Sequence, residues 1–419
     1  MGLFNILALL LALTALFSYL NHRTLRLPTT IGVMLISLVF SLALVAIGAL
    51  LPGTDAWARE LVANLHFDET LLHGMLSFLL FAGAIHVNFD DLYRNKWIIG
   101  TLATVGTLMS TAIVGVVSWW LLAALAIPVP FIFCLLFGAL ISPTDPIAVL
   151  SILKSVGAPK SLETKITGES LFNDGIGVVV FIVLLGFAGA GHGSVPPGAG
   201  EIAVLFLQEV VGGAIFGAAI GYGSYWMIKS VDSYDVEILI TLALVTAGYA
   251  AANALHLSGP IAIVVAGLLI GNHGRRLAMS EKTRRHIDLF WELIDEILNA
   301  VLFVLIGLEI IVLTYTMPVM AAALMAIPLV LTARLIAVSL PVWILRHFRT
   351  FTPGAIRLMT WGGLRGGISV ALALSLPGGE EREIILPITY TVVVFSIFVQ
   401  ATTIRKLVRS ILPTTDAEQ

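Results

Sequence analysis

Four polar residues stand at the head of an otherwise apolar segment. Residues 168–177 read GESLFNDGIG, and the next eleven residues read VVVFIVLLGFA. On a helix, Glu169 and Asn173 share a face at i,i+4, and Ser170 and Asp174 share a second face about 100° round the axis. Oxygen-rich surroundings without sulfur suit hard cations such as Na⁺ or Li⁺. The segment therefore predicts a cation site in which Asp174 supplies the charge.

A second polar group interrupts the preceding apolar run, which reads CLLFGALISPTDPIAVL at 134–150. Two prolines flank Thr144 and Asp145, and a proline lacks an amide hydrogen and clashes with the turn before it. We expect the helix to open there and to free backbone carbonyls, which a bilayer tolerates only inside protein or beside water. Asp145 and the hydroxyls of Thr144 and Ser170 would then complete the cation shell around Asp174.

The expected chemistry is competition between two ions for one carboxylate. A carboxylate removed from water binds a proton more readily, whereas a bound cation favours the ionised form. Proton and metal ion would therefore exclude one another at Asp174, and either occupied form would be neutralised. This gives coupled exchange without another energy source. The sequence has no GxxxxGK[ST] phosphate loop, and we expect no cofactor besides the transported ions.

Two arginines also fall in apolar runs and need neutralising partners. A guanidinium is in practice always protonated, so Arg334 in LTARLIAV requires a counter-charge, for which Glu169 is the candidate. This gives Glu169 a structural role that differs from ion binding by Asp174. Arg365 lies in GGLRGGIS, where four glycines predict a second helix break at 362–367. We expect Arg365 to neutralise carbonyl ends at that same break.

The composition places these residues in a membrane. Mean hydropathy is +1.00, hydrophobic residues make up 58% and charged residues 12%, whereas soluble proteins carry about 25% charged residues. Apolar runs near 20 residues span a bilayer as helices, and their spacing is not that of barrel strands. The single cysteine excludes an intramolecular disulfide.

The apolar runs predict an all-α polytopic membrane protein with about 13 transmembrane helices. Residues 1–419 form a single transmembrane domain with no separate soluble domain, because the polar stretches are short. The predicted limits are 3–20, 31–51, 71–89, 97–126, 131–153, 166–188, 203–228, 238–256, 258–272, 288–315, 320–345, 355–376 and 384–404.

The basic residues predict the orientation. Of 23 lysines and arginines, two fall within spans and two, Arg59 and Arg382, fall in loops on one side. All the others fall on the opposite side, which the positive-inside rule assigns to the cytoplasm. The N-terminus is then outside and the C-terminus cytoplasmic, in a multi-pass protein of the plasma (inner) membrane.

The two breaks predict an inverted repeat. The break around 142–146 lies in the fifth predicted span and the break at 362–367 lies in the twelfth, so the two spans enter from opposite faces. Paired interrupted spans are typical of transporters whose site lies between the repeats. The halves share no evident residue-level identity, so this prediction rests on hydropathy and on helix-breaking residues.

The motifs resemble those of NhaP-type sodium/proton antiporters of the monovalent cation:proton antiporter-1 family, which are related to the animal sodium/hydrogen exchangers. The resemblance covers essentially the whole chain. Its most specific segments are SPTDPIAV at 142–149, GESLFNDGIGVVVF at 168–181, TARLIAV at 332–338 and GGLRGGISVALALSLP at 362–377.

The resemblance implies a secondary transporter rather than an enzyme. It implies a homodimer with a dimerisation domain and a six-helix core that moves as an elevator. Asp174 matches the essential ion- and proton-carrying aspartate, and Thr144, Asp145 and Ser170 match residues of the Na⁺ site. Glu169 and Arg334 match a structural ion pair with Asn173 nearby. An Asn-Asp pair is associated with electroneutral exchange of one Na⁺ for one H⁺, and the family acts in pH homeostasis.

One position departs from the family pattern. Relatives often carry an acidic residue near the end of the third span, where this chain has His86. A histidine has an ordinary pKa near 6.5 and can act as a pH sensor. The alternative is that His86 packs near the membrane interface without a sensing role.

Three other functions compete with Na⁺/H⁺ exchange. The same machinery could exchange K⁺ for H⁺, and composition does not choose between similar cations. An intramembrane aspartyl protease could use Asp145 and Asp174 as a proton-sharing pair, but it gives Arg334 no role. A passive channel needs a continuous wet pore, which suits this site less well than occlusion. Monovalent cations, protons and lipid are the expected partners, and nucleic acid is not.

Overall fold

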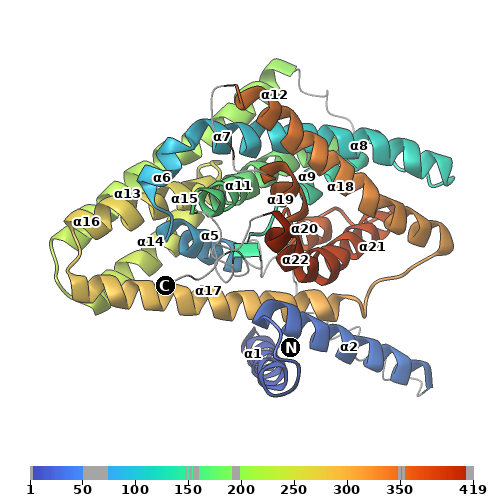
Figure 1. Cartoon of the computed structure of the whole chain (residues 1–419), viewed down its shortest axis with the longest axis horizontal. Helices are drawn as coiled ribbons and strands as arrows, with labels where there is room; N and C mark the ends of the chain where they lie inside the picture. Colours follow the sequence, from blue (N-terminus) through green and yellow to red (C-terminus); the bar gives the residue numbers. More distant parts are fainter. Residues whose placement is uncertain are drawn as a thin grey trace.

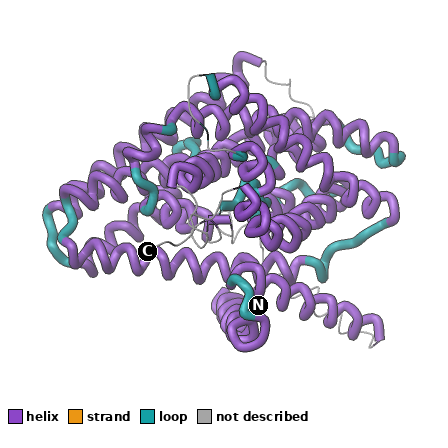
Figure 2. Tube along the Cα trace, in the orientation of Figure 1, coloured by secondary structure: helices purple, strands orange, loops and turns teal. Residues whose placement is uncertain are grey.

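The computed structural model describes residues 3–50, 74–146, 149, 150, 153, 160–190, 199–347, 351 and 354–411. Within those residues the regular structure is helical, and the one β-type pairing is an isolated bridge between Asp145 and Leu364. Figure 2 shows the helices joined by short connections. The predicted all-α fold class is confirmed.

The first half of the chain follows the predicted runs closely. Several of its helices are continued by a single π-helical turn (η), in which one extra residue widens the helix. In chain order the elements are α1 (Leu3–Leu20), η1 (Asn21–Leu25), α2 (Thr29–Leu50), α5 (Leu76–Ile85), α6 (Phe89–Arg94), α7 (Lys96–Thr101), η3 (Leu102–Gly106), α8 (Thr107–Ala124), α9 (Phe131–Ile141), α11 (Lys160–Ala190), α12 (Ala199–Leu207), η4 (Gln208–Gly212) and α13 (Gly213–Lys229).

The second half begins with two helices that the sequence also separates. A turn at 255–258 divides them, and Ser258 caps the second by accepting a hydrogen bond from the Ile261 amide. The elements are α14 (Tyr234–Ala254), α15 (Gly259–Leu269), η5 (Ile270–Gly274), α16 (Arg275–Leu277), α17 (Glu281–Glu309), α18 (Met317–Leu345), α19 (Ala355–Trp361), α20 (Gly367–Leu374), α21 (Glu380–Phe395), η6 (Ser396–Gln400) and α22 (Ala401–Ile411).

The helices are long and apolar enough to cross a membrane. Seven stretches of the described residues meet both criteria, and three shorter apolar helices include α9 and the α15–η5 segment. Large apolar side chains face outward, as at Met317 (87% exposed) and Trp120 (68%), which is favourable in lipid and unfavourable in water. The predicted number of 13 spans stays a prediction, because residues 71–73 and most of 147–153, which belong to predicted spans, lie outside the described residues.

Six of the predicted spans pack into one group. The continuous helix α7–η3–α8 packs on α9 and α18, while α11 packs on α9. On the other side, α18 packs on α19 and on α21, and α20 packs on α21 and α9. Each run of three consecutive spans has an interrupted helix in the middle. This is the inverted-repeat arrangement with two broken helices that the sequence predicts.

The remaining helices form a second group beside the first. α5, α13, α14 and α15 pack on one another, and α17 packs along α5 and α14. Figure 1 shows α17 as a long rod, with α1 and α2 on the side that faces away from the rest of the molecule. α11 contacts helices of both groups, α9 in the first and α15 in the second. The polar head of α11 is therefore central.

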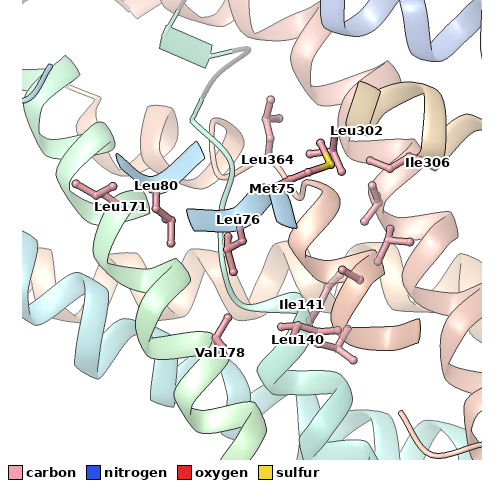
Figure 3. Close-up of a cluster of buried hydrophobic side chains, with 14 of the residues drawn as sticks. Met75, Leu76, Leu80, Leu140, Ile141, Leu171, Val178, Leu302, Ile306 and Leu364 are labelled. Atoms are coloured by element: carbon pink, nitrogen blue, oxygen red, sulfur yellow. The ribbon is translucent and has the colours of Figure 1, made fainter. Parts of the chain in front are cut away.

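Buried apolar side chains fill the space between the two groups. Figure 3 shows Leu171 of α11 beside Leu80 of α5, and Leu302 of α17 beside Leu364. All four are at most 6% exposed. The contact is therefore made by aliphatic side chains, which lack the directional hydrogen bonds that would fix one relative position.

A row of glycines lets α13 approach α15 closely. A β-carbon at Gly217 would lie 2.7 Å from the Ala262 Cα and still closer to the Ala262 carbonyl oxygen. A β-carbon at Gly223, on the same helix, would have no neighbour within 4 Å among the described atoms. Small residues at such contacts allow backbone-to-backbone packing in membranes.

The two glycines predict opposite outcomes for the same substitution. Gly217→Ala should lower the stability of the purified protein by about 1–3 kcal/mol because the helices must separate. Gly223→Ala should be neutral or stabilising by up to about 1 kcal/mol, since alanine favours helix. Thermal unfolding in detergent measures both. Equal effects of the two substitutions would contradict the packing described for α13 and α15.

Candidate ion-binding site

The two interrupted helices cross at their breaks. α9 ends at Ile141 and the chain then runs without helix to residue 146, while the second break covers 362–366 between α19 and α20. The Asp145 amide donates a 2.8 Å hydrogen bond to the Leu364 carbonyl oxygen. Two short extended segments thus run antiparallel inside the first helix group, and the ends of the half-helices converge on them.

Glycines make this crossing possible by their size. A β-carbon at Gly366 would lie 2.7 Å from Oδ2 of Asp145 and 2.8 Å from its Cβ. A β-carbon at Gly363 would lie 2.6 Å from Nε of Arg334. Both distances are well below van der Waals contact. The glycines of GGLRGGIS are therefore required because other chains approach the backbone at these points.

The polar head of α11 holds the first break in place. The Thr144 hydroxyl lies 2.9 Å from the Ser170 hydroxyl and accepts a 2.9 Å hydrogen bond from Nδ2 of Asn173. The Thr144 amide donates to Oδ1 of Asn173 at 3.3 Å. All three side chains are buried. Both ends of the Asn173 amide are thus engaged by Thr144, which ties the break to α11.

Asp174 and Asp145 place two carboxylates near the first break. Each is partly buried, and their carboxylates are close enough for the two charges to interact. The Asp174 carboxylate receives no hydrogen bond from the described residues. A carboxylate held beside another carboxylate and away from bulk water requires a proton or a cation to neutralise it. Thr144 directly precedes Asp145, Ser170 lies one helical turn before Asp174, and the two hydroxyls contact each other.

Glu169 and Arg334 form a buried ion pair. Both guanidinium Nη atoms donate to the Glu169 carboxylate, Nη1 to Oε1 and Nη2 to Oε2 at 2.9 Å. Glu169 is 1% exposed and Arg334 is 6% exposed. Nη2 of Arg334 also donates to the Met359 carbonyl at 3.3 Å, near the carboxyl end of α19. The pair therefore joins α11, α18 and α19.

Arg365 lies in the second break but binds carbonyls of the first. Its Nη1 donates to the carbonyl oxygens of Ser142 and, at 2.9 Å, of Pro143. The sequence predicted that Arg365 would neutralise carbonyls of its own break at 362–367. This prediction was wrong. The crossing of the two segments carries the side chain to the end of α9, where a cation complements the negative end of the helix dipole.

The structure adds polar residues that the sequence prediction missed. The Ser396 hydroxyl accepts a 2.9 Å hydrogen bond from the Arg365 amide, and Nε2 of Gln400 donates to the Trp361 carbonyl at the end of α19. Both residues belong to η6. A lone glutamine in the apolar run VVVFSIFVQ was the only available signal for them.

An acidic residue of α17 also reaches this region. Asp295 lies close enough to Asp145 for their charges to interact. Its backbone carbonyl accepts a 2.8 Å hydrogen bond from Nδ2 of the buried Asn299. The second helix group therefore contributes negative charge beside the crossing.

His86 lies at the end of α5 and not in either of the two breaks. It is the exposed residue that follows the last turn of α5, and its Nδ1 lies 2.8 Å from the Ala82 carbonyl oxygen. The predicted role of His86 in pH sensing stays a prediction.

Comparison with known proteins shows to which family the chain belongs. The family described as "Sodium/hydrogen exchanger, transmembrane" matches residues 10–410. The chain belongs to the sodium/hydrogen exchanger family. This family consists of secondary transporters rather than enzymes, as the motifs predicted.

Individual relatives resemble the chain over nearly its full length. The chain is 52% identical over 412 residues to the Na⁺/H⁺ antiporter NhaP of Pseudomonas aeruginosa, covering 97% of this chain and 96% of the relative. It is 35% identical over 402 residues to the Na⁺/H⁺ antiporter NhaH of Halobacillus dabanensis, covering 93% of each. The sodium proton antiporter MjNhaP1 from Methanocaldococcus jannaschii at pH 8 has a similar fold, with a TM-score of 0.74, 20% identity and 98% coverage of each chain.

The buried ion pair allows a test of whether Glu169 is a structural residue or a cation ligand. Glu169→Ala should lower stability by about 3–5 kcal/mol, because Arg334 is left charged and buried without its partner. Thermal unfolding of the purified protein measures the loss. The matched control is Glu281→Ala, which breaks an exposed pair with Arg285 and should cost less than about 1 kcal/mol. A stable Glu169→Ala protein whose Na⁺ affinity alone is changed would make Glu169 a cation ligand instead.

Proposed function

We propose that this protein exchanges Na⁺ or Li⁺ for H⁺ across the membrane, and that both ions compete for Asp174. Relatives that match over nearly the whole chain are named Na⁺/H⁺ antiporters. One feature of the site carries the proposal. Both buried arginines are already engaged, Arg334 by Glu169 and Arg365 by backbone carbonyls. Their hydrogen bonds leave Asp174 to be neutralised by a mobile ion.

The surroundings of Asp174 suit a small hard cation. Asp145 supplies a second carboxylate, and the hydroxyls of Thr144 and Ser170 supply neutral oxygens within the same buried contact. Such ligands are typical of sites for alkali-metal and other hard cations. When the cation leaves, a proton on Asp174 restores neutrality. The charged empty site is then the state least able to cross an apolar barrier, which couples the two fluxes.

The proposed stoichiometry is one cation for one proton. The residue before Asp174 is Asn173, whose amide carries no charge and is bound to Thr144 on both sides. It therefore cannot take up a second proton. Exchange of one monovalent cation for one proton moves no net charge.

We further propose that the first helix group moves against the second as an elevator, within a homodimer of the plasma membrane. The aliphatic contact between Leu171, Leu80, Leu302 and Leu364 supports sliding, because it contains no directional bonds that must break (Figure 3). The N-terminus would lie outside and the C-terminus in the cytoplasm, in keeping with the positive-inside rule. Residues 1–419 would act as one transmembrane domain.

Removing the charge of Asp174 should abolish exchange. In proteoliposomes with an imposed pH gradient, Asp174→Asn should show no dequenching on addition of Na⁺, Li⁺ or K⁺, while the protein stays folded by size-exclusion chromatography. The matched control is Glu281→Gln, which removes an exposed carboxylate at the start of α17 and should retain Na⁺-dependent exchange. Retained activity of Asp174→Asn would reject the assigned role, and activity of the unaltered protein with K⁺ alone would change the proposed cargo.

Turnover should be nearly independent of membrane potential. Each net charge moved would couple to about 2.3 kcal/mol per 100 mV, so an electroneutral cycle is indifferent to voltage. Exchange rates are measured in proteoliposomes clamped at different potentials with valinomycin and K⁺. A strong dependence of the rate on the clamped potential would argue against one-for-one exchange while leaving the role of Asp174 intact.

A further inference from the structure

The second helix group brings one partly buried carboxylate towards the crossing. Asp295 lies in α17 and forms no ion pair with a described residue. Two neighbouring acidic residues of the same helix, Glu292 and Glu296, are exposed, so water and salt can screen their charges. Of these three carboxylates, Asp295 therefore has the charge that is screened least.

The contacts of two consecutive glycines connect α17 with Asp145. A β-carbon at Gly366 would lie 2.7 Å from Oδ2 of Asp145, and a β-carbon at Gly367 would lie 2.7 Å from Cδ2 of Leu302. The Asp145 carboxylate and the Leu302 side chain thus pack against neighbouring residues of the second break. Figure 3 shows Leu302 beside Leu364, whose carbonyl oxygen accepts from the Asp145 amide. Leu302 therefore lies on the face of α17 that meets the crossing.

Asp295 belongs to that same face of α17. It precedes Leu302 by seven residues, which places the two side chains about 20° apart around the helix axis and about 10 Å apart along it. Asn299 lies between them and is buried, and its Nδ2 donates to the Asp295 carbonyl oxygen. The charges of Asp295 and Asp145 are close enough to interact. The helix face and the charge interaction therefore agree on where Asp295 lies.

A negative charge beside the cation site favours the binding of any cation. Asp295 need not be a ligand for this effect, because it acts on the site through space and through Asp145. At a partly buried site, the Coulomb energy of two nearby charges corresponds to a several-fold change in a binding constant. Na⁺ and H⁺ carry the same charge, so Asp295 strengthens the binding of both to a similar extent.

The two carboxylates belong to different helix groups. Asp145 lies in the first group, which contains both breaks, and Asp295 lies in the second. Under the proposed elevator movement, the distance between them changes from one state to the other. Asp295 lies in the half of α17 nearer its start, which the positive-inside rule places on the cytoplasmic side. Outward movement of the first group would carry Asp145 away from it.

We propose that Asp295 is a positioning residue for the transported cation, whose charge raises the cation affinity of the site at Asp145 and Asp174 when that site faces the cytoplasm. The outward-facing site lacks this contribution, so a cation is released more easily to the outside than to the cytoplasm. The inference rests on the proposed exchange of Na⁺ for H⁺ and assigns a further residue to it.

Sided transport assays on the full-length protein test this role, in vesicles from a host without sodium/proton antiporters of its own. Inside-out vesicles present the cytoplasmic face to added Na⁺, and right-side-out vesicles present the outer face. At about pH 8.5, where few protons compete, Asp295→Asn should raise the KM for Na⁺ about fivefold at the cytoplasmic face. Its KM at the outer face, and its rate at saturating Na⁺, should stay within about twofold of the unaltered protein.

Two variants and a second pH separate charge from packing. Asp295→Glu keeps the charge and should bring the KM back to within about twofold of the unaltered protein. Glu281→Gln removes the exposed carboxylate at the start of α17 and should leave the KM unchanged at both faces. At about pH 6.5 the KM values of Asp295→Asn and of the unaltered protein should converge, because the lost charge weakens the competing proton as much as Na⁺.

Three results would overturn the proposal. The first is an unchanged KM of Asp295→Asn at the cytoplasmic face, and the second is an equal rise at both faces. The third is a raised KM that Asp295→Glu does not reverse, since it would come from packing and not from charge. Absence of Na⁺-dependent exchange by the unaltered protein is a different result, which would reject the proposed function itself.

Discussion

The structure depends on how charge is matched where there is little water. Two guanidinium groups and several carboxylates lie within the first helix group, and each must find a partner because isolated charges are strongly disfavoured there. Arg334 is matched by Glu169, and Arg365 is matched by the carbonyl ends of a broken helix. The carbonyl oxygens freed at a helix break therefore help to neutralise a buried arginine. They supply partial charges where a second set of acidic side chains would otherwise be needed.

This matching gives two carboxylates of one helix different surroundings. Glu169 and Asp174 lie five residues apart on one helix, yet they meet different neighbours. Glu169 is enclosed by Arg334, whereas Asp174 faces Asp145. The two carboxylates are chemically alike, and only their partners differ. Glu169 has a fixed cationic partner in Arg334, whereas no described side chain supplies one to Asp174, and the proposed exchange of ions at Asp174 rests on this difference.

Much of the fold could be predicted because hydropathy and helix-breaking residues are local features of the sequence. Hydropathy placed α1 at 3–20, and the Pro143–Pro146 segment and the four glycines located both breaks. Helix ends were less accurate where they leave the apolar region. α17 begins at Glu281, seven residues before the predicted start at 288, because its first turns are charged. The third span ends at Ile85, since Asn88 begins a new helix by capping α6.

The candidate site was predictable in its members but less so in its contacts. Glu169 and Arg334 could be paired from the sequence because a buried arginine needs a buried carboxylate as its partner. The acceptors of Arg365 could not, because no local pattern says that a side chain at 365 will reach carbonyls at 142 and 143. The same holds for Ser396, an ordinary hydroxyl in an apolar run until the fold brings it to the Arg365 amide. Contacts between distant segments follow from the crossing, which is a property of the whole chain.

The crossed breaks also have a consequence for the order of biosynthesis. Residues near the amino end are made first, and the partners of the first break lie much later in the chain. Glu169 precedes Arg334 by 165 positions, and Ser142 precedes Arg365 by 223. During synthesis, the contacts of Glu169 and of the Ser142 carbonyl can therefore form only after Arg334 and Arg365 have been made. The first break is therefore made well before the side chains that hold it, and the full set of contacts at the crossing can exist only near the end of synthesis.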